Sequence, residues 1–135
     1  MALKIVLKPG ERIIIGGAVL TNGKTTAQFL VENQVPILRQ KDIMGKNEAI
    51  TPCRRIYLVI QLMYIDGGNL TTHHHAYWNL VKEVIKAAPS TLPLIDRIGD
   101  HILNNRYYQA LKLARKLIEY EEETVANARR ANRNL

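Results

Sequence analysis

The fold of this chain is decided at its start, by the stretch Leu3-Lys4-Ile5-Val6-Leu7-Lys8. Alternate side chains of an extended strand point to opposite sides, so Leu3, Ile5 and Leu7 share one side. Lys4 and Lys8 fall on the other side, with Val6 between them. The stretch therefore predicts a strand with one apolar and one basic face, and a basic face suits a phosphate backbone.

Turn residues divide the next part of the chain into similar short segments. Between the turns at Pro9-Gly10, Gly16-Gly17, Asn22-Gly23 and Asn33-Gln34 we expect strands at 3–8, 12–16, 18–21, 25–32 and 35–39. Asn22-Gly23 is the strongest of these turn signals, because both residue types tolerate a positive φ, and it predicts a hairpin.

Beyond residue 44 the pattern becomes helical. Thr51 is an N-cap residue and Pro52 suits the first helical position, so a helix should begin there and end at Asp66-Gly67-Gly68. It is apolar nearly all round, which predicts burial, and its expected core residues are Ile56, Val59, Ile60 and Met63. Further helices are expected at 71–88, 92–104 and 106–127.

The expected class is α+β, with a small five-strand β-sheet or barrel module followed by about four helices. We assign residues 1–44 to a basic β module, 45–127 to a helical module and 128–135 to a frayed basic tail. The two modules can also behave as one cooperative domain.

Composition limits the partners and the compartment. The 135 residues carry a net charge of +7, which favours an anionic partner. One cysteine, Cys53, allows neither an internal disulfide nor a cysteine metal site. The start of the chain lacks a signal-peptide pattern, and its longest apolar run, Ile56 to Ile65, is too short for a bilayer. We expect a cytoplasmic protein that does not contact membranes.

Several groupings resemble catalytic or metal chemistry, and each has a simpler interpretation. His73-His74-His75 has adjacent spacing, whereas chelation on a helix needs spacings of three or four. Asp96 and Asp100 share a helix face beside arginines, as in an ion-paired surface. Gly23-Lys24-Thr25 lacks the glycine spacing of a P-loop. We therefore expect no enzyme, no catalytic residue, no metal and no cofactor.

Two smaller features can have either a structural or a functional role. Cys53 has no visible partner base and is interpreted as structural. The pair Tyr107-Tyr108 can stack on a base or pack at the rim of the core, and packing is the commoner role.

The basic residues of the strands are the better candidates for function. Lys4, Lys8, Arg12, Arg39 and Lys41 are the expected RNA-binding residues. The alternative for them is protection of exposed strand edges, which lysines provide in many sheets.

Two blocks of the sequence carry a family resemblance that covers nearly the whole chain. Residues Leu3 to Arg12 with Gly17-Ala18-Val19, and the helix Thr51 to Asp66, resemble the bacterial flagellin translational regulator family FlbT. Cys53 departs from the small residue expected there. The resemblance implies a cytoplasmic regulator of flagellum biogenesis. Such a regulator associates with the 5′ untranslated region of flagellin mRNA and alters its translation and decay, mostly as a repressor.

A shorter resemblance covers about a third of the chain. Residues Lys8 to Gly16 and Val35 to Lys41 are similar to the first and last strands of the carbon storage regulator family. There, strands of interlocked subunits bring basic residues together over RNA. The similarity implies RNA contacts for Lys8 and Arg39 and adjacent first and fifth strands, although Leu7 stands where that family has an arginine.

These observations lead to a function and one alternative from another class. We expect a repressor that binds the flagellin mRNA 5′ leader without catalysis, with mRNA decay carried out by a cellular nuclease. The alternative is an adaptor or chaperone-like partner of flagellin or another small flagellar protein, without specific RNA binding. A homodimer is also expected, because short strands leave open sheet edges.

Overall fold

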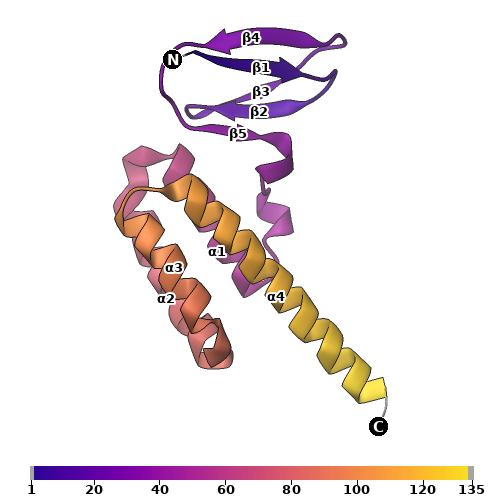
Figure 1. Ribbon diagram of the computed structural model, residues 1–135, viewed down its shortest axis with the longest axis vertical. Helices are drawn as coiled ribbons and strands as arrows, with labels where there is room; N and C mark the ends of the chain where they lie inside the picture. The colour runs from indigo at the N-terminus through magenta and orange to yellow at the C-terminus, as the bar shows by residue number, and fades with distance from the viewer. Residues whose placement is uncertain (1, 134–135) are drawn as a thin grey trace. The chain divides into compact units, whose positions relative to one another are not determined.

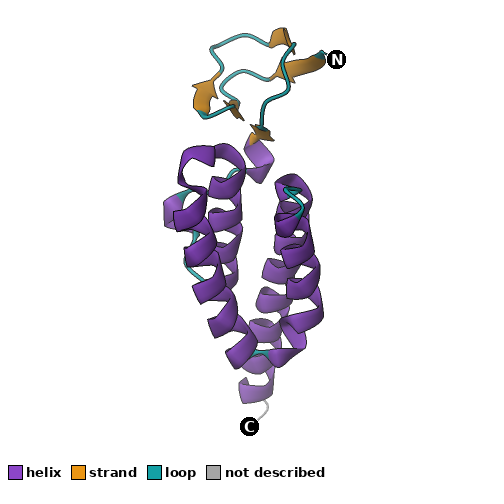
Figure 2. Cartoon of the chain, turned by 90° about the vertical axis from the view of Figure 1, so that its left-hand side faces the viewer, coloured by secondary structure: helices purple, strands orange, loops and turns teal. Residues whose placement is uncertain are grey.

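The computed structural model describes residues 2–133 and divides the chain into two compact units, Met1–Ile43 and Met44–Leu135. All five strands belong to the first unit and all four α-helices to the second (Figure 1, Figure 2). This confirms the predicted α+β class and the order of strands before helices.

The five expected strands form two antiparallel sheets. β1 (Leu3–Leu7) pairs with β4 (Ala27–Val31) in a two-stranded sheet. The second sheet has the order β3-β2-β5, built from β3 (Ala18–Thr21), β2 (Arg12–Ile15) and β5 (Ile37–Arg39). A 3₁₀ turn, η1 (Gln40–Asp42), follows β5.

The alternation of β1 produces the core of this unit. Ile5 and Leu7 are buried together with Ile13 of β2. Partly buried side chains pack around these three: Ile15, Phe29, Val31 and Ile37. Leu3, at the end of the β1–β4 ladder, stays half exposed. The apolar side of β1 is therefore correctly predicted, and its opposite side carries Lys4 and Val6.

The turns differ from the prediction at Asn22-Gly23. Gly16 adopts φ +59° in the two-residue connection between β2 and β3, a conformation that glycine adopts readily. β3 and β4, by contrast, lie in different sheets, so Asn22-Gly23 forms no hairpin between them. The Asn22 amide instead donates to the carbonyls of Leu7, Lys8 and Thr25, at 3.2, 2.8 and 2.9 Å. Asn22 thus holds the loop that connects β3 to β4 against the end of β1.

The second unit consists of four helices joined by short connections. They are α1 (Pro52–Ile65), α2 (Leu70–Ala87), α3 (Leu92–Leu103) and α4 (Tyr107–Arg133), with 3₁₀ turns η2 (Lys46–Glu48), η3 (Gly67–Asn69) and η4 (Pro89–Thr91). The predicted start of α1 is confirmed, because Thr51 Oγ1 accepts a hydrogen bond from the Arg54 backbone N–H at 3.2 Å.

α1 is the central helix of this unit and packs against both α2 and α4. Ile56, Ile60 and Met63 are buried as predicted. The prediction for Val59 is wrong: it is half-buried, since two neighbouring helices cover α1 on two sides and leave part of its circumference open. The buried Gln61 side chain is satisfied by the backbone of Met44, accepting at 2.8 Å and donating at 3.0 Å.

α4 is longer than predicted. It continues through residues 128–133, where we expected a frayed tail, and residues 134–135 lie outside the described part of the chain. Its last turns are rich in Ala, Glu and Arg and contain neither Gly nor Pro, which explains why the helix continues. Its buried residues end at Ile118, so the distal half is held by helix propensity more than by packing. Within residues 2–133, no helix combines the length and apolarity needed to cross a membrane.

Candidate nucleic-acid interface

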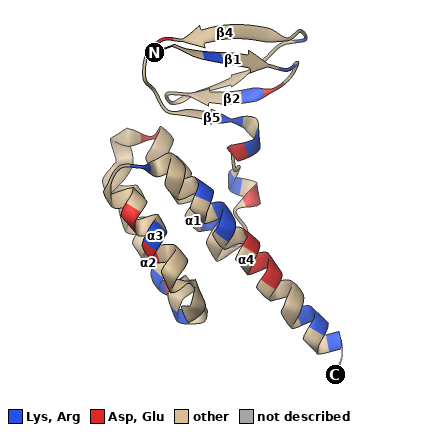
Figure 3. Ribbon diagram, viewed as in Figure 1, with Lys and Arg blue, Asp and Glu red and all other residues tan. Residues whose placement is uncertain are grey.

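A polar groove on the β unit brings together three of the five predicted RNA-binding residues. Lys8, Arg39 and Lys41 line it with Val6, Pro9, Gly10, Glu11 and Gln40, around a volume of about 630 Å³. Lys8 comes from the turn after β1, Arg39 ends β5, and Lys41 lies in η1. Figure 3 marks basic positions on β1, in the turn that follows it and after β5. Lys8 and Arg39, which are 31 positions apart in sequence, thus line one concave surface.

An ion pair fixes the guanidinium of Arg39 at the edge of this groove. Arg39 Nη2 lies 3.2 Å from Glu11 Oε2 and donates to the Val6 carbonyl at 2.8 Å. Glu11 Oε1 accepts from the Lys8 backbone N–H at 2.9 Å. The Lys8 hydrogen bond, and then Arg39, hold the pKa of Glu11 below its ordinary value. Glu11 is thus a carboxylate at neutral pH and offsets part of the positive charge of the groove.

These contacts give Arg39 a structural role that the sequence did not indicate. Its side chain connects the end of β5 to β1 and to the turn that contains Glu11. β1 and β5 are not paired with each other, contrary to our expectation, because β1 pairs with β4 and β5 with β2. Arg39 bridges the two sheets through its side chain. It remains 39% exposed, so its outer surface is accessible to a ligand.

Lys4 and Arg12 lie away from the groove lining. Lys4 pairs with Leu30 in the β1–β4 register, on the outer side of that sheet. Ile13 is the register partner of Arg39, so Arg12, one residue earlier, belongs to the opposite face of its sheet. The Arg12 backbone N–H donates to Gln40 Oε1 at 2.6 Å, which ties η1 to β2. The five basic residues therefore do not form one continuous face.

Glu11 and Gln40 are the groove residues that sequence reasoning missed. Glu11 lies in the block Leu3 to Arg12 that carries the family resemblance, but its role depends on Arg39, 28 residues away. No local pattern marks Gln40. Both residues line the groove because of contacts between segments that are distant in sequence.

One residue of the histidine cluster on α2, His73, contacts Asp66 at the end of the preceding helix α1. His73 Nε2 lies 3.0 Å from Asp66 Oδ2 and its side chain is largely buried. This contact, followed by one from Asn69, lowers the pKa of Asp66. Across residues 2–133, no group of three His, Cys, Asp or Glu side chains is arranged to hold a metal ion.

The other candidates from the sequence are Cys53, the helix face of Asp96 and Asp100, and the pair Tyr107-Tyr108. Burial, and then the nearby Glu121 carboxylate, raise the pKa of the Cys53 thiol to about 12. Asp96 and Asp100 are exposed, and Arg106 Nε donates to His101 Nδ1 at 2.9 Å. The Tyr108 ring packs near Tyr64, and the Lys112 ammonium lies 4.9 Å from its centroid.

Comparison with known proteins identifies the family. The model of the family described as "Flagellar protein FlbT" matches residues 3–125. This chain belongs to the FlbT family. The match includes the β unit with its groove and all four helices except the last eight residues of α4.

Individual relatives agree with this assignment. The chain is 49% identical over 124 residues to a probable flagellum biosynthesis repressor protein FlbT 1 of Bradyrhizobium diazoefficiens, covering 91% of this chain and 84% of that protein. A probable flagellum biosynthesis repressor protein FlbT of Rhodopseudomonas palustris is 42% identical, with 93% and 99% covered. The flagellum biosynthesis repressor protein FlbT of Caulobacter vibrioides is 36% identical, with 94% and 92% covered. No solved structure matches the chain.

Proposed function

We propose that this FlbT-family protein represses flagellum biosynthesis by binding the 5′ untranslated region of flagellin mRNA in the cytoplasm, which alters the translation and decay of that message. The names of its relatives, flagellum biosynthesis repressors, support the process and its sign. The resemblance in sequence supports the RNA step. In this proposal the protein does no chemistry, and a cellular nuclease degrades the message.

The observation that carries the RNA proposal is the groove lined by Lys8, Arg39 and Lys41. Three cations around one concave, polar surface attract a phosphate backbone and release its counterions on binding. The net charge of +7 on the whole chain adds long-range attraction for RNA.

The three cations have different roles in this proposal. Lys8 and Lys41 are compact charges on flexible stems and contact phosphates. Val6 and Glu11 both accept from Arg39 Nη2, and Nε is buried, so Nη1 is the donor group that is left for a ligand, and it is held in a fixed direction. A donor held in a fixed direction suits recognition of a base edge, which gives sequence preference. The Glu11 carboxylate repels phosphates that come close to it in the groove. It therefore disfavours nonspecific contact with RNA.

The test is a titration of the protein with its flagellin leader RNA and with a scrambled RNA of the same composition. The proposal expects tighter binding of the leader and a steep loss of affinity for both RNAs as salt rises. Equal affinity for the two RNAs, or an affinity that does not change with salt, would contradict it.

A second function is favoured by apolar side chains that stand exposed on the helical unit. Leu103 is 71% and Trp78 43% exposed, on α3 and α2. Such side chains suit an adaptor or chaperone-like protein that binds flagellin or another small flagellar protein without specific RNA recognition. Co-purification of such a partner that resists high salt, with no preference for the leader RNA, would favour this function over the first.

A further inference from the structure

The distal half of α4 extends beyond the helices that it packs against. The last buried residue of α4 is Ile118, and the helix continues to Arg133. Figure 1 and Figure 2 show this part of α4 running past the ends of the other three helices. Because most helices in proteins are held by tertiary packing, a long helical extension without it is a candidate for a contact with another molecule.

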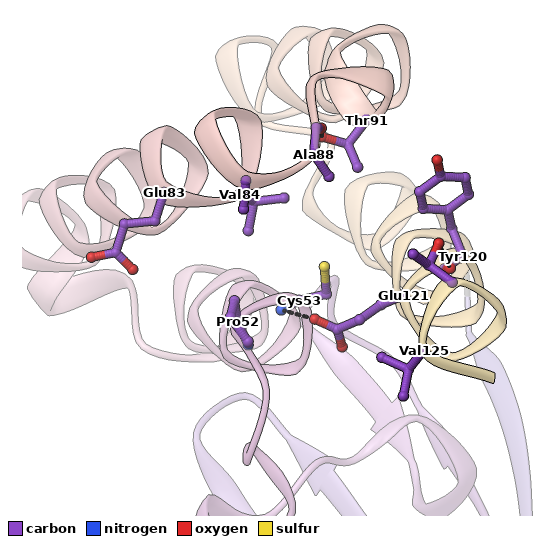
Figure 4. A pocket seen from close by; sticks show the side chains of 11 residues that line it. Pro52, Cys53, Glu83, Val84, Ala88, Thr91, Tyr120, Glu121 and Val125 are labelled. Carbon is purple, nitrogen blue, oxygen red and sulfur yellow. Dashed lines mark hydrogen bonds between the residues drawn. The ribbon is translucent and has the colours of Figure 1, made fainter. Parts of the chain in front are cut away.

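One side of the extension still faces its own unit. Glu121 and Val125 line an apolar cavity of about 310 Å³ between α4, the start of α1 and the end of α2 (Figure 4). Glu121 Oε2 accepts a hydrogen bond from the Cys53 backbone N–H at 3.2 Å. Glu122 Oε1 lies 3.0 Å from Arg54 Nη2. These contacts define the side of α4 that points toward the bundle.

The opposite side of the extension carries an ordered series of charges. Ala126 follows the fully buried Leu117 by nine residues, which is about two and a half helical turns, so it lies on the opposite side of α4. The residues of that side, at spacings of four and three, form what we call the distal face: Glu119, Glu123, Ala126, Arg130 and Arg133. The four charged residues are exposed, and Figure 3 shows acidic positions followed by basic ones along this part of α4.

The charges of the distal face are not balanced within one chain. Glu119 and Glu123 are four positions apart, and Arg130 and Arg133 three apart, so like charges are neighbours on adjacent turns. Such like-charge pairs destabilise a helix. Among residues 2–133, none of these four side chains takes part in an ion pair. Opposite charges supplied by another molecule would therefore stabilise the extension.

The distal face is complementary to its own reverse. Along the chain it reads acidic, acidic, Ala, basic, basic. In an antiparallel pair centred on Ala126, Glu119 lies opposite the second copy's Arg133, and Glu123 opposite the second copy's Arg130. Symmetry repeats both ion pairs around a small central residue. A parallel pair in register would instead place Glu against Glu and Arg against Arg.

We propose that the distal face of α4 binds the same face of a second copy of this chain, antiparallel and centred on Ala126. The contact belongs to the helical unit alone, so it is distinct from association through sheet edges. Its basic half lies beyond residue 125, where the family match ends. Because exposed ion pairs are weak and screened by salt, the contact forms at low salt and high protein concentration and dissociates as salt rises.

A disulfide at the centre of the pair tests this contact. Under mild oxidation at low salt, Ala126→Cys should form a disulfide-linked dimer, because the symmetry brings the two copies of this residue together. Lys116→Cys is the matched control, since it is also exposed on α4 but its two copies would lie about 30 Å apart along the helices. The buried Cys53 is present in both proteins. We expect Ala126→Cys to cross-link at least several-fold faster, and this advantage to disappear at high salt.

Charge reversal tests the pairing itself, with the Ala126→Cys cross-link as the readout. Arg130→Glu with Arg133→Glu makes the distal face wholly acidic, and Glu119→Lys with Glu123→Lys makes it wholly basic. Each double variant alone should lose the cross-link, and an equal mixture of the two should regain it. All four positions are exposed, and circular dichroism checks that each variant folds. Cross-linking of Ala126→Cys no faster than that of Lys116→Cys, or cross-linking that both reversals leave unchanged, would overturn the proposal.

Discussion

Arg39 and Glu11 form an ion pair at the edge of the basic groove, with 3.2 Å between Nη2 and Oε2. The pair joins the end of β5 to the turn after β1, and it places a carboxylate among the cations proposed to contact RNA. The same two residues therefore affect the stability of the β unit and the electrostatics of its groove.

Removal of the Glu11 charge should strengthen RNA binding. Glu11→Gln keeps a side-chain oxygen for the Lys8 N–H and takes away the repulsion of phosphates, so affinity for leader and scrambled RNA should both rise several-fold at low salt. Glu32→Gln is the control, since it changes net charge equally at an exposed position outside the groove lining. Equal gains in both variants, measured by titration, would mean that only net charge matters.

The same ion pair predicts how stability depends on pH. The pKa of Glu11 is lower in the folded protein than in the unfolded chain, so the unfolded state binds its proton more readily. The contribution of Glu11 to stability is complete above its ordinary pKa of 4.5 and is lost as the pH falls through the lowered folded-state pKa. Denaturant unfolding between pH 7 and pH 3 should show a shallower acid loss for Glu11→Gln than for the unchanged protein. Parallel curves would contradict this.

The burial of α1 predicts unequal costs for two neighbouring truncations. Ile60 is fully buried, so Ile60→Ala should reduce the free energy of unfolding by about 2–5 kcal/mol. Val59 is only half-buried, and Val59→Ala should cost clearly less. Chemical denaturation of both variants measures the difference. Similar costs would show that α1 packs differently from this description.

Open sheet edges predict self-association. Within the described residues, β1 pairs only with β4 and β5 only with β2, so each leaves one edge without a strand partner. We propose that the protein is a homodimer that uses such an edge. Light scattering at tens of micromolar should give twice the mass of one chain. The mass of one chain at that concentration would exclude the dimer.

Local sequence patterns predicted the elements well, because each depends on nearby residues. Alternation in Leu3–Leu7 located β1, and Thr51-Pro52 located the start of α1. Asn22-Gly23 misled us because a turn signal does not specify which strands it connects, and here the chain crosses between sheets. The end of α4 was missed because a polar, solvated helix resembles a frayed tail in sequence.

The candidate site was predictable only in part, for a related reason. Lys8, Arg39 and Lys41 were recognisable as basic strand residues, but their arrangement around one groove depends on the fold. The bond from Arg39 to Val6 and its ion pair with Glu11 join segments about 30 residues apart. No local pattern encodes such contacts.

The most direct test of the RNA account is the ratio of leader to scrambled RNA affinity, measured at two salt concentrations for Lys8→Ala, Arg39→Lys and a joint Ala variant of Arg129, Arg130 and Arg133. Lys8→Ala should weaken both RNAs alike and lower the salt slope by roughly one unit. Arg39→Lys keeps the charge and loses the Nη1 donor that Val6 and Glu11 hold in place, so it should lose about 1–3 kcal/mol of discrimination. The tail variant should keep its discrimination. A folded Arg39→Lys protein that discriminates like the unchanged chain, with a tail variant that does not, would contradict the groove as the RNA site and move that site to α4.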